Sequence, residues 1–268
     1  MIETAAGLIL RTRPLTETSL IVHWLTPTLG RLATVAKGAR RANSPFRGKL
    51  DLFYLADFSF SRSRRSELHT LREASLRQTH SRLREDLGLL QQACYCTALV
   101  EQSTEMETPL AGVFELMTGL LGQLVAGPLH EPRGARDGPL SLSLSPSEGE
   151  RVPKAGEGAV HGPEVRQRAV EAPQATTIFA FELKLLTDLG LKPDLDQSNL
   201  NPGTKQLVKA LAEKDWPVVA RLKPTAAQAA ELGRFLHGFL IYHLGRIPKG
   251  WRTRRPRSRY SERAKHSK

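Results

Sequence analysis

The 268-residue sequence contains only two cysteines and no long hydrophobic run. Cys94 and Cys96 lie two residues apart in a helical pattern, so their thiols point to different sides and offer neither a disulfide framework nor a complete metal site. No apolar stretch reaches the ~18 residues that span a bilayer, and the N-terminus lacks the basic start and apolar region of a signal peptide. We therefore expect a cytoplasmic protein without membrane contacts.

The sequence also lacks the motifs that accompany catalysis. It has no phosphate-binding glycine loop followed by Lys-Ser or Lys-Thr, no dinucleotide fingerprint, no nucleophile elbow and no His-Glu-x-x-His. Asp194 and Asp196 lie close together in "LKPDLDQ", but two carboxylates without a third ligand favour turn and cap residues over a cation site. The sequence thus predicts a binding protein, not an enzyme, with no cofactor and no metal.

Charge is abundant but unevenly distributed. The formal net charge is +12 and the isoelectric point is about 10.1. Residues 1–78 carry a net +7, residues 79–251 a net −2 and residues 252–268 a net +7. An excess of this kind at the two ends of the chain indicates a polyanion or an anionic surface as partner.

The first 78 residues read as about five strands. Apolar and β-prone segments alternate with Pro and Gly turns, and the expected strands fall within 7–14, 19–26, 31–38, 49–62 and 67–76. Five short strands avoid unpaired edge strands only if the sheet closes into a barrel. We therefore expect an oligonucleotide-binding (OB) barrel as one domain of a multidomain α+β protein.

After Leu76 the apolar spacing becomes helical, which predicts an all-α bundle over 79–250. Thr108-Pro109 is expected to open one helix, and Thr225 with Gln228 has the spacing of a capping box for the last helix. A segment rich in Gly, Pro, Ser and Glu at about 128–175 reads as a disordered insertion, and 251–268 reads as a disordered basic tail.

The stretch "VAKGARR", residues 35–41, ends a predicted strand in three cations around a glycine. Lys37, Arg40 and Arg41, together with the backbone N–H groups of the turn, would suit phosphates. A solvated charge cluster is the alternative, because a short basic run alone does not decide between the two.

These residues, read in order, resemble a known family. The run from "GLILRTRP" through "VAKGARR", followed by "SPFRGKLDLFYLADFSFSR", resembles RecO, the bacterial recombination mediator of DNA repair, and the similarity resumes at "FELKLLTDLGLKPDLD" and "LNPGTKQLVKAL". The resemblance implies binding of single- and double-stranded DNA and strand annealing in the nucleoid. It also implies partnership with RecR, indirect action on RecA, and a docking site for the C-terminal tail of single-stranded DNA-binding protein.

The resemblance assigns the basic segment to DNA phosphates. Charge and position suggest further DNA contacts from Arg11, Arg13, Arg47, Lys49, Arg62, Arg64 and Arg65, while Phe46, Tyr54 and Phe58 are either base-stacking or core residues. For the tail peptide we expect a cationic rim from Lys184, Arg234 and Arg246. An RNA-binding OB protein is the alternative function, since its electrostatics would be the same.

One departure from the family concerns zinc. Some RecO proteins carry a four-cysteine zinc site directly after the segment that matches "LKPDLD". Here only "QSN", residues 197–199, stands in that interval. We therefore expect no zinc ribbon, and a simple turn over 194–202 that leads into a helix at Asn201-Pro202.

Overall fold

The structure, a computed structural model, describes residues 2–126 and 172–248. The predicted tail and most of the predicted insertion lie outside these residues. Helix α4 begins at Ala172, however, which is earlier than the C-terminal limit expected for the insertion. No helix among the described residues is long and apolar enough to cross a membrane.

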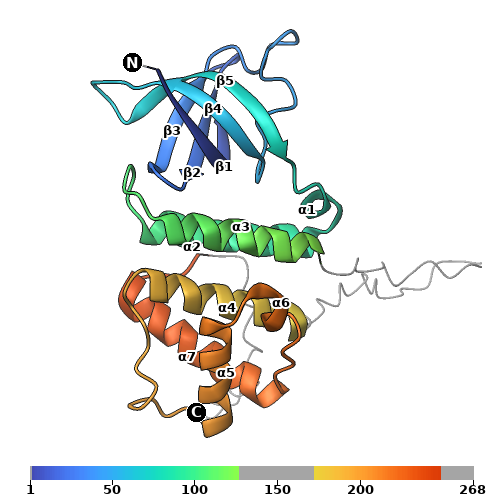
Figure 1. The fold of residues 1–268 in the computed structure, drawn as a ribbon, viewed down its shortest axis with the longest axis vertical. Coiled ribbons are helices and arrows are strands. Elements are labelled where there is room, and N and C mark those ends of the chain that lie inside the picture. The colour runs from blue at the N-terminus through green and yellow to red at the C-terminus, as the bar shows by residue number, and fades with distance from the viewer. Residues whose placement is uncertain (1, 127–171, 249–268) are drawn as a thin grey trace, which may run out of the picture. The chain divides into compact units, whose positions relative to one another are not determined.

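Five strands form the N-terminal part, as the alternating pattern predicts. They close into a barrel in the order β1-β2-β3-β5-β4, in which only β3 and β5 run parallel (Figure 1). This arrangement is consistent with an OB-fold. The strands are β1 (Ile2–Pro14), β2 (Leu20–Thr26), β3 (Gly30–Ala36), β4 (Leu55–Ser61) and β5 (Leu68–Gln78).

Strand β1 belongs to both halves of the barrel. Its first part pairs with β4 and its second part with β2, and the register shifts between Ile9 and Arg11. Ile9 points into the barrel, where the rings of Trp24 and Phe58 stack at 4.0 Å. Its neighbours Leu8 and Leu10 pack instead against helices, because successive side chains of a strand alternate between its two faces.

The prediction that the fourth strand begins at residue 49 is wrong. β4 starts at Leu55, and the preceding residues form a loop in which Phe53 has a φ of +62°. This loop is apolar because it contributes to two cores: Leu50 and Tyr54 pack on the barrel interior, whereas Phe53 packs on the helices. Hydrophobicity here reflects burial of a loop and not strand pairing.

Seven helices follow the barrel in the described residues. Helix α2 starts after Asp86, whose carboxylate accepts from the N–H groups of Gly88 and Leu89, and α7 opens with the predicted capping box of Thr225 and Gln228. The helices are α1 (Arg82–Glu85), α2 (Leu87–Ser103), α3 (Ala111–Ala126), α4 (Ala172–Asp188), α5 (Pro202–Glu213), α6 (Trp216–Val219) and α7 (Ala226–Leu244).

Two of the predicted helix starts have different outcomes. Helix α3 begins at Ala111 rather than at Thr108-Pro109, because the residues before it are held in a loop against β3. Helix α5 does begin with Asn201 as N-cap and Pro202 as the first helical residue. The turn expected over 194–202 is therefore confirmed.

A common core lies across the predicted boundary between residues 78 and 79. Leu8, Leu10 and Leu25 of the barrel share one hydrophobic cluster with α2, α3 and α4. A second cluster joins α4, α5 and α7. The division into domains at this point stays a prediction, because the strands end there while the packing continues.

Candidate nucleic-acid interface

Residues 37–54 form the loop between β3 and β4, and this loop carries five of the ten predicted DNA contacts. Gly38 takes a φ of +69° to turn the chain after β3. The backbone N–H of Arg40 donates to the carbonyl oxygen of Thr18 at 3.0 Å, and its guanidinium donates to the carbonyl oxygen of Thr16 at 3.1 Å. The loop is thereby fixed to the β1–β2 connection.

One part of the sequence-based hypothesis for this loop is wrong. The N–H groups of Ala39, Arg40 and Arg41 donate to the carbonyl oxygens of Ala36, Thr18 and Gly38, so the turn itself uses them. Backbone donors were expected to help cradle phosphates. These three donors are therefore not available to an anion, which the arginine side chains of the loop could still bind.

Side chains from this loop surround a hollow of about 360 Å³. Arg40, Arg41 and Arg47 line it together with Leu20 and Phe46. The three arginines are exposed and have no carboxylate partner among the described residues. Arg40 and Arg41 of the predicted run thus share one hollow with Arg47, whereas Lys37 does not line it. We name residues 37–49 the basic loop.

Two other predicted cations lie on β1. Arg11 forms an ion pair with Glu101 of α2, so its charge serves the contact between barrel and helices. Arg13, two residues on, is exposed near the end of the strand. The structure therefore leaves Arg13 and not Arg11 available to a ligand.

The predicted contacts Arg62, Arg64 and Arg65 lie away from the basic loop. They belong to the β4–β5 connection, which enters β5 at Leu68, and Leu68 pairs with Ala33 in the middle of β3. The basic loop leaves β3 after Ala36. Because β3 and β5 are parallel and pair only from Ala33 to Val35, the two groups of cations lie beyond opposite ends of this paired segment.

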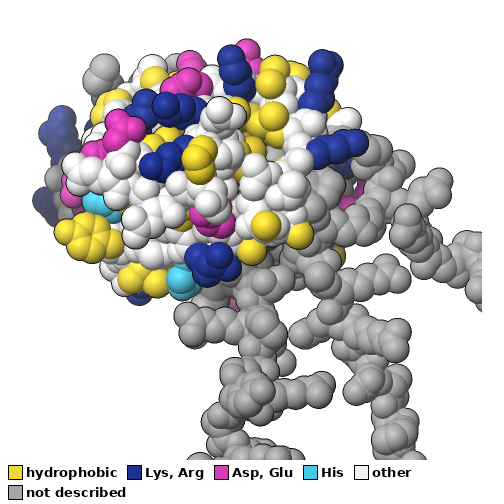
Figure 2. Space-filling view, turned by 90° about the horizontal axis from the view of Figure 1, so that it is seen from below, with side chains coloured by type: hydrophobic (Ala, Val, Ile, Leu, Met, Phe, Trp, Pro, Cys, Tyr) yellow, Lys and Arg dark blue, Asp and Glu magenta, His cyan; other side chains and the backbone are white. Residues whose placement is uncertain are grey.

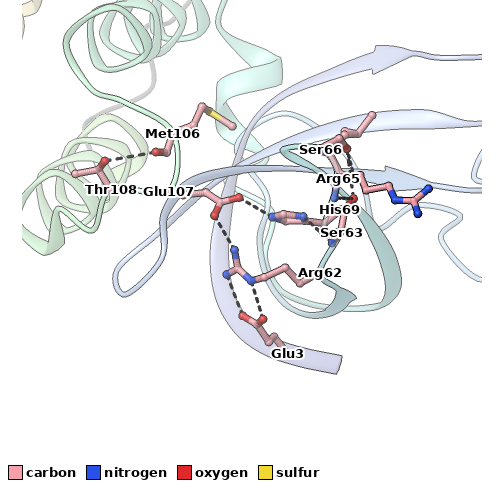
Figure 3. Close-up of polar contacts among 10 residues, drawn as sticks. Glu3, Arg62, Ser63, Arg65, Ser66, His69, Met106, Glu107 and Thr108 are labelled. Atoms are coloured by element: carbon pink, nitrogen blue, oxygen red, sulfur yellow. Dashed lines mark hydrogen bonds and ion pairs between the residues drawn. The ribbon is translucent and has the colours of Figure 1, made fainter. Parts of the chain in front are cut away.

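Arg62 is held by two carboxylates. Its guanidinium donates to Glu3 at 2.7 and 3.0 Å and to Glu107 at 2.6 Å, and Glu107 also contacts Nε2 of His69 at 2.8 Å (Figure 3). The hydrogen bond from Arg62 lowers the pKa of Glu3, and the same pair raises the pKa of Arg62. The guanidinium of Arg62 is therefore engaged in holding Glu3 and Glu107 and is not free to bind a phosphate in this conformation.

The three aromatic candidates for base stacking are engaged within the protein. Phe58 stacks on Trp24 and is 3% exposed, and Phe46 is 6% exposed. Tyr54 packs beneath the guanidinium of Arg84, 4.6 Å from its ring centre. Core packing, the alternative considered from the sequence, is confirmed for Phe46 and Phe58.

Of the hollows lined by the described residues, none brings together the three cations predicted to rim a tail-peptide site. Nζ of Lys184 donates to the carbonyl oxygen of Ala212 at 3.0 Å, and burial lowers its pKa. Arg234 lines a separate hollow of about 380 Å³ beside Glu231. Figure 2 shows Lys and Arg side chains spread among hydrophobic and acidic ones on one face rather than gathered in a patch. The carbonyl of the third, Arg246, accepts from Gln102.

Metal-ligand types do not cluster in the parts of the chain that the structure describes, where no group of three His, Cys, Asp or Glu could hold an ion. The carboxylate of Asp194 accepts from the N–H of Asp196 at 2.9 Å, as a turn residue would. Cys96 is buried, which raises its thiol pKa, whereas Cys94 is exposed, so the two thiols do lie in different surroundings.

Reasoning from the sequence missed Arg72 and Arg77 on β5. Both are exposed and line a hollow of about 680 Å³ together with Lys49 and Phe46 of the basic loop. Strict alternation would place these two residues, five positions apart, on opposite faces of β5. The register shifts of the β4–β5 pair, which skip Arg72 and Arg77, bring both to one hollow, and the sequence alone does not indicate such shifts.

Comparison with known proteins agrees with this architecture. Residues 1–80 match the family described as Recombination protein O N terminal. DNA repair protein RecO of Bacillus pumilus is 26% identical over 255 residues, which cover 92% of this chain and 81% of that protein.

Two further relatives match mainly one half of the chain. DNA repair protein RecO of Bacillus subtilis is 33% identical over 127 residues, 47% of this chain and 49% of the relative. The protein of that name from Rhodopirellula baltica is 32% identical over 118 residues, 44% of each chain. These two alignments span less than half the length of the relatives. The chain is thus similar to RecO proteins, and the family match lies on its N-terminal barrel.

Proposed function

We propose that this protein is a non-enzymatic DNA-binding mediator of recombination in DNA repair. It binds single- and double-stranded DNA through the basic loop of the barrel and acts in the cytoplasm at the nucleoid. The names of its relatives support the biological role. The single observation that carries the binding role is the hollow in which Arg40, Arg41 and Arg47 converge without carboxylate partners among the described residues.

The chemistry of this hollow fits phosphate better than any neutral ligand. Guanidinium groups offer several donors in a planar fork and stay charged at all physiological pH values. Contacts of this type supply affinity that does not depend on base sequence, which a protein acting on any damaged DNA requires. Lys49 adds charge within the same loop, and Arg13 on β1 and Arg64 and Arg65 on the β4–β5 connection are further exposed cations.

The remaining roles rest on the similarity to RecO proteins. We propose that the protein anneals complementary strands and, with RecR, helps RecA replace single-stranded DNA-binding protein. Its helical part would receive the acidic C-terminal tail of that protein. Arg234 and Arg246 are the better candidates for that contact, because Lys184 already donates to a backbone carbonyl.

The test is charge reversal in the basic loop. A Lys37→Glu/Arg40→Glu/Arg41→Glu variant should bind a fluorescent single strand more weakly, and the slope of log K against log salt should fall by roughly 0.7 for each lost contact. Lys205→Glu/Lys209→Glu/Lys223→Glu makes the same charge change on α5 and beyond and serves as control. Equal binding by both variants would refute the assignment.

The same titration decides between DNA and RNA. A matched RNA strand is compared with the DNA strand, and annealing of complementary DNA coated with single-stranded DNA-binding protein is measured in parallel. Tight RNA binding without DNA annealing would favour the RNA-binding alternative.

A further inference from the structure

A second hollow adjoins the basic loop on the β1-β4-β5 side of the barrel. It has a volume of about 680 Å³, and Arg72 and Arg77 of β5 line it together with Lys49. Phe46 lines both this hollow and the smaller one that Arg40, Arg41 and Arg47 surround. The two hollows are therefore neighbours on either side of one buried ring.

Several small side chains contribute to the lining of the larger hollow. Ala6, Ser59 and Ser75 are among them, beside the largely buried rings of Phe46 and Phe58. Because these small side chains project little from the sheet, a ligand can approach the strands closely.

The cations of this hollow retain free donors. Nε of Arg72 donates to Ser61 and Nε of Arg77 donates to Asp57, at 2.8 and 2.5 Å. Among the residues described by the structure, no hydrogen bond involves the terminal nitrogens of these two arginines or Nζ of Lys49. Asp57 and Glu73 also line the hollow, so its three cations and two carboxylates leave a small positive excess.

We infer that a single DNA strand bound in the basic loop continues past Phe46 into this hollow, with its phosphates at Arg72 and Arg77. The inference rests on the proposed DNA-binding function. The two arginines are five positions apart on β5, about 17 Å along an extended strand. A nucleic-acid strand rises ~3.4 Å per nucleotide in a helix, so this length takes several nucleotides.

This path differs in part from the one that OB-folds commonly use, which follows the face of strands 2 and 3 and the loops between strands 1 and 2 and between strands 4 and 5. The basic loop is hydrogen-bonded to the β1–β2 connection, so the two paths share that end. In this protein the β4–β5 loop is tied down at Arg62 by Glu3 and Glu107. The hollows instead lie on the β3–β4 loop and on β5. The cations and the hollows together therefore favour a path for the DNA strand along the side of the barrel that carries Arg72 and Arg77.

The test measures binding of an oligothymidylate of about 20 nucleotides, longer than the ~4–16 that one OB-fold covers. Arg72→Gln/Arg77→Gln should lose at least about fivefold in affinity and about 1.4 in salt slope. Lys209→Gln/Lys223→Gln is the matched control. The rival path is tested with Arg64→Gln/Arg65→Gln, which should lose less than the β5 variant.

A fluorescent label provides a readout that does not depend on charge. Ser75→Cys in a Cys94→Ser background places the dye in the hollow, and its emission should change on addition of the strand, whereas a dye at Lys209→Cys should not respond. The proposed path would be overturned if the parent binds the strand, Arg72→Gln/Arg77→Gln binds it with the same affinity, and the emission of the dye at Ser75→Cys does not change. Failure of the parent to bind would instead overturn the proposed function.

Discussion

The backbone N–H of Glu107 donates to the carbonyl oxygen of Arg31 at 2.7 Å, so the loop between α2 and α3 is hydrogen-bonded directly to β3. Gly30 permits this approach. A Cβ atom at that position would overlap the backbone carbonyl of Thr108. The contact between barrel and helices therefore depends on a glycine as well as on charged side chains.

We predict that Gly30→Ala lowers the free energy of unfolding by about 2–4 kcal/mol, as measured in urea. Its φ of +66° alone costs an L-residue about 1–2 kcal/mol, and the overlap with Thr108 adds to this. Gly48 is the matched control, because its φ is +71° but a Cβ atom placed there would have no neighbour within 4 Å. Gly48→Ala should cost only the backbone part. Equal losses would show that the close approach is unimportant.

Arg62 should matter more for stability than for DNA. Arg62→Gln removes the hydrogen bonds to Glu3 and Glu107, and because these groups are partly exposed we expect a loss of about 1 kcal/mol in unfolding free energy. Strand affinity should fall less than in Arg40→Gln, whose guanidinium lines the open hollow. A larger loss of affinity in Arg62→Gln would mean that phosphate displaces Glu107.

His80 should make the protein less stable in mild acid. Its Nδ1 donates to the carbonyl oxygen of Phe53 at 2.7 Å, and burial lowers its pKa from the ordinary 6.5. Below about pH 6.5 the imidazole of His80 becomes protonated in the unfolded chain but stays neutral in the folded protein. The free energy of unfolding therefore falls as the pH falls.

This pH dependence is measured by urea unfolding between about pH 7.5 and 5.5. His80→Gln should have a flatter profile, although not a flat one, since burial lowers the pKa of His23 as well. His243→Gln, at an exposed position, is the control and should follow the parent. A profile for His80→Gln that is as steep as that of the parent would contradict the prediction.

Chelation should leave the fold unaffected. The interval that carries zinc ligands in some family members is reduced to Gln197, Ser198 and Asn199, so no metal binding energy is expected to contribute to folding. Protein purified without an affinity tag should contain far less than one zinc per chain, and its melting temperature should not change in EDTA. Near-stoichiometric zinc with a lowered melting temperature would contradict this.

Local patterns predicted local features well. The alternation of β2 and β3, the capping box at Thr225 and the helix start at Pro202 each depend on residues that are neighbours in the sequence. The start of β1 was missed because "IETAAG" is poor in β-prone side chains. Its small residues are needed there, since a Cβ at Gly7 would lie 2.9 Å from the ring of Phe58.

The candidate site was predictable only in part, because only some of its residues are neighbours in the sequence. Lys37, Arg40 and Arg41 form one run and could be grouped by reading along the chain. The partners of Arg62, in contrast, lie 59 and 45 residues away, so the residues around Arg62 do not indicate that its charge is neutralised. Arg72 and Arg77 approach Lys49 only because β5 folds back against β4.

The cluster shared by the barrel and the helices has a consequence for synthesis on the ribosome. Leu8, Leu10 and Leu25 emerge before the helices, yet their burial requires α2 and α3, and the cluster is completed by Leu185 of α4. A nascent chain that ends after β5 would close its strands and still present these leucines to water. The nascent chain therefore exposes apolar surface of the barrel until α4 has been translated, and α4 in turn exposes its other apolar face until α5 and α7 follow, which favours aggregation during synthesis.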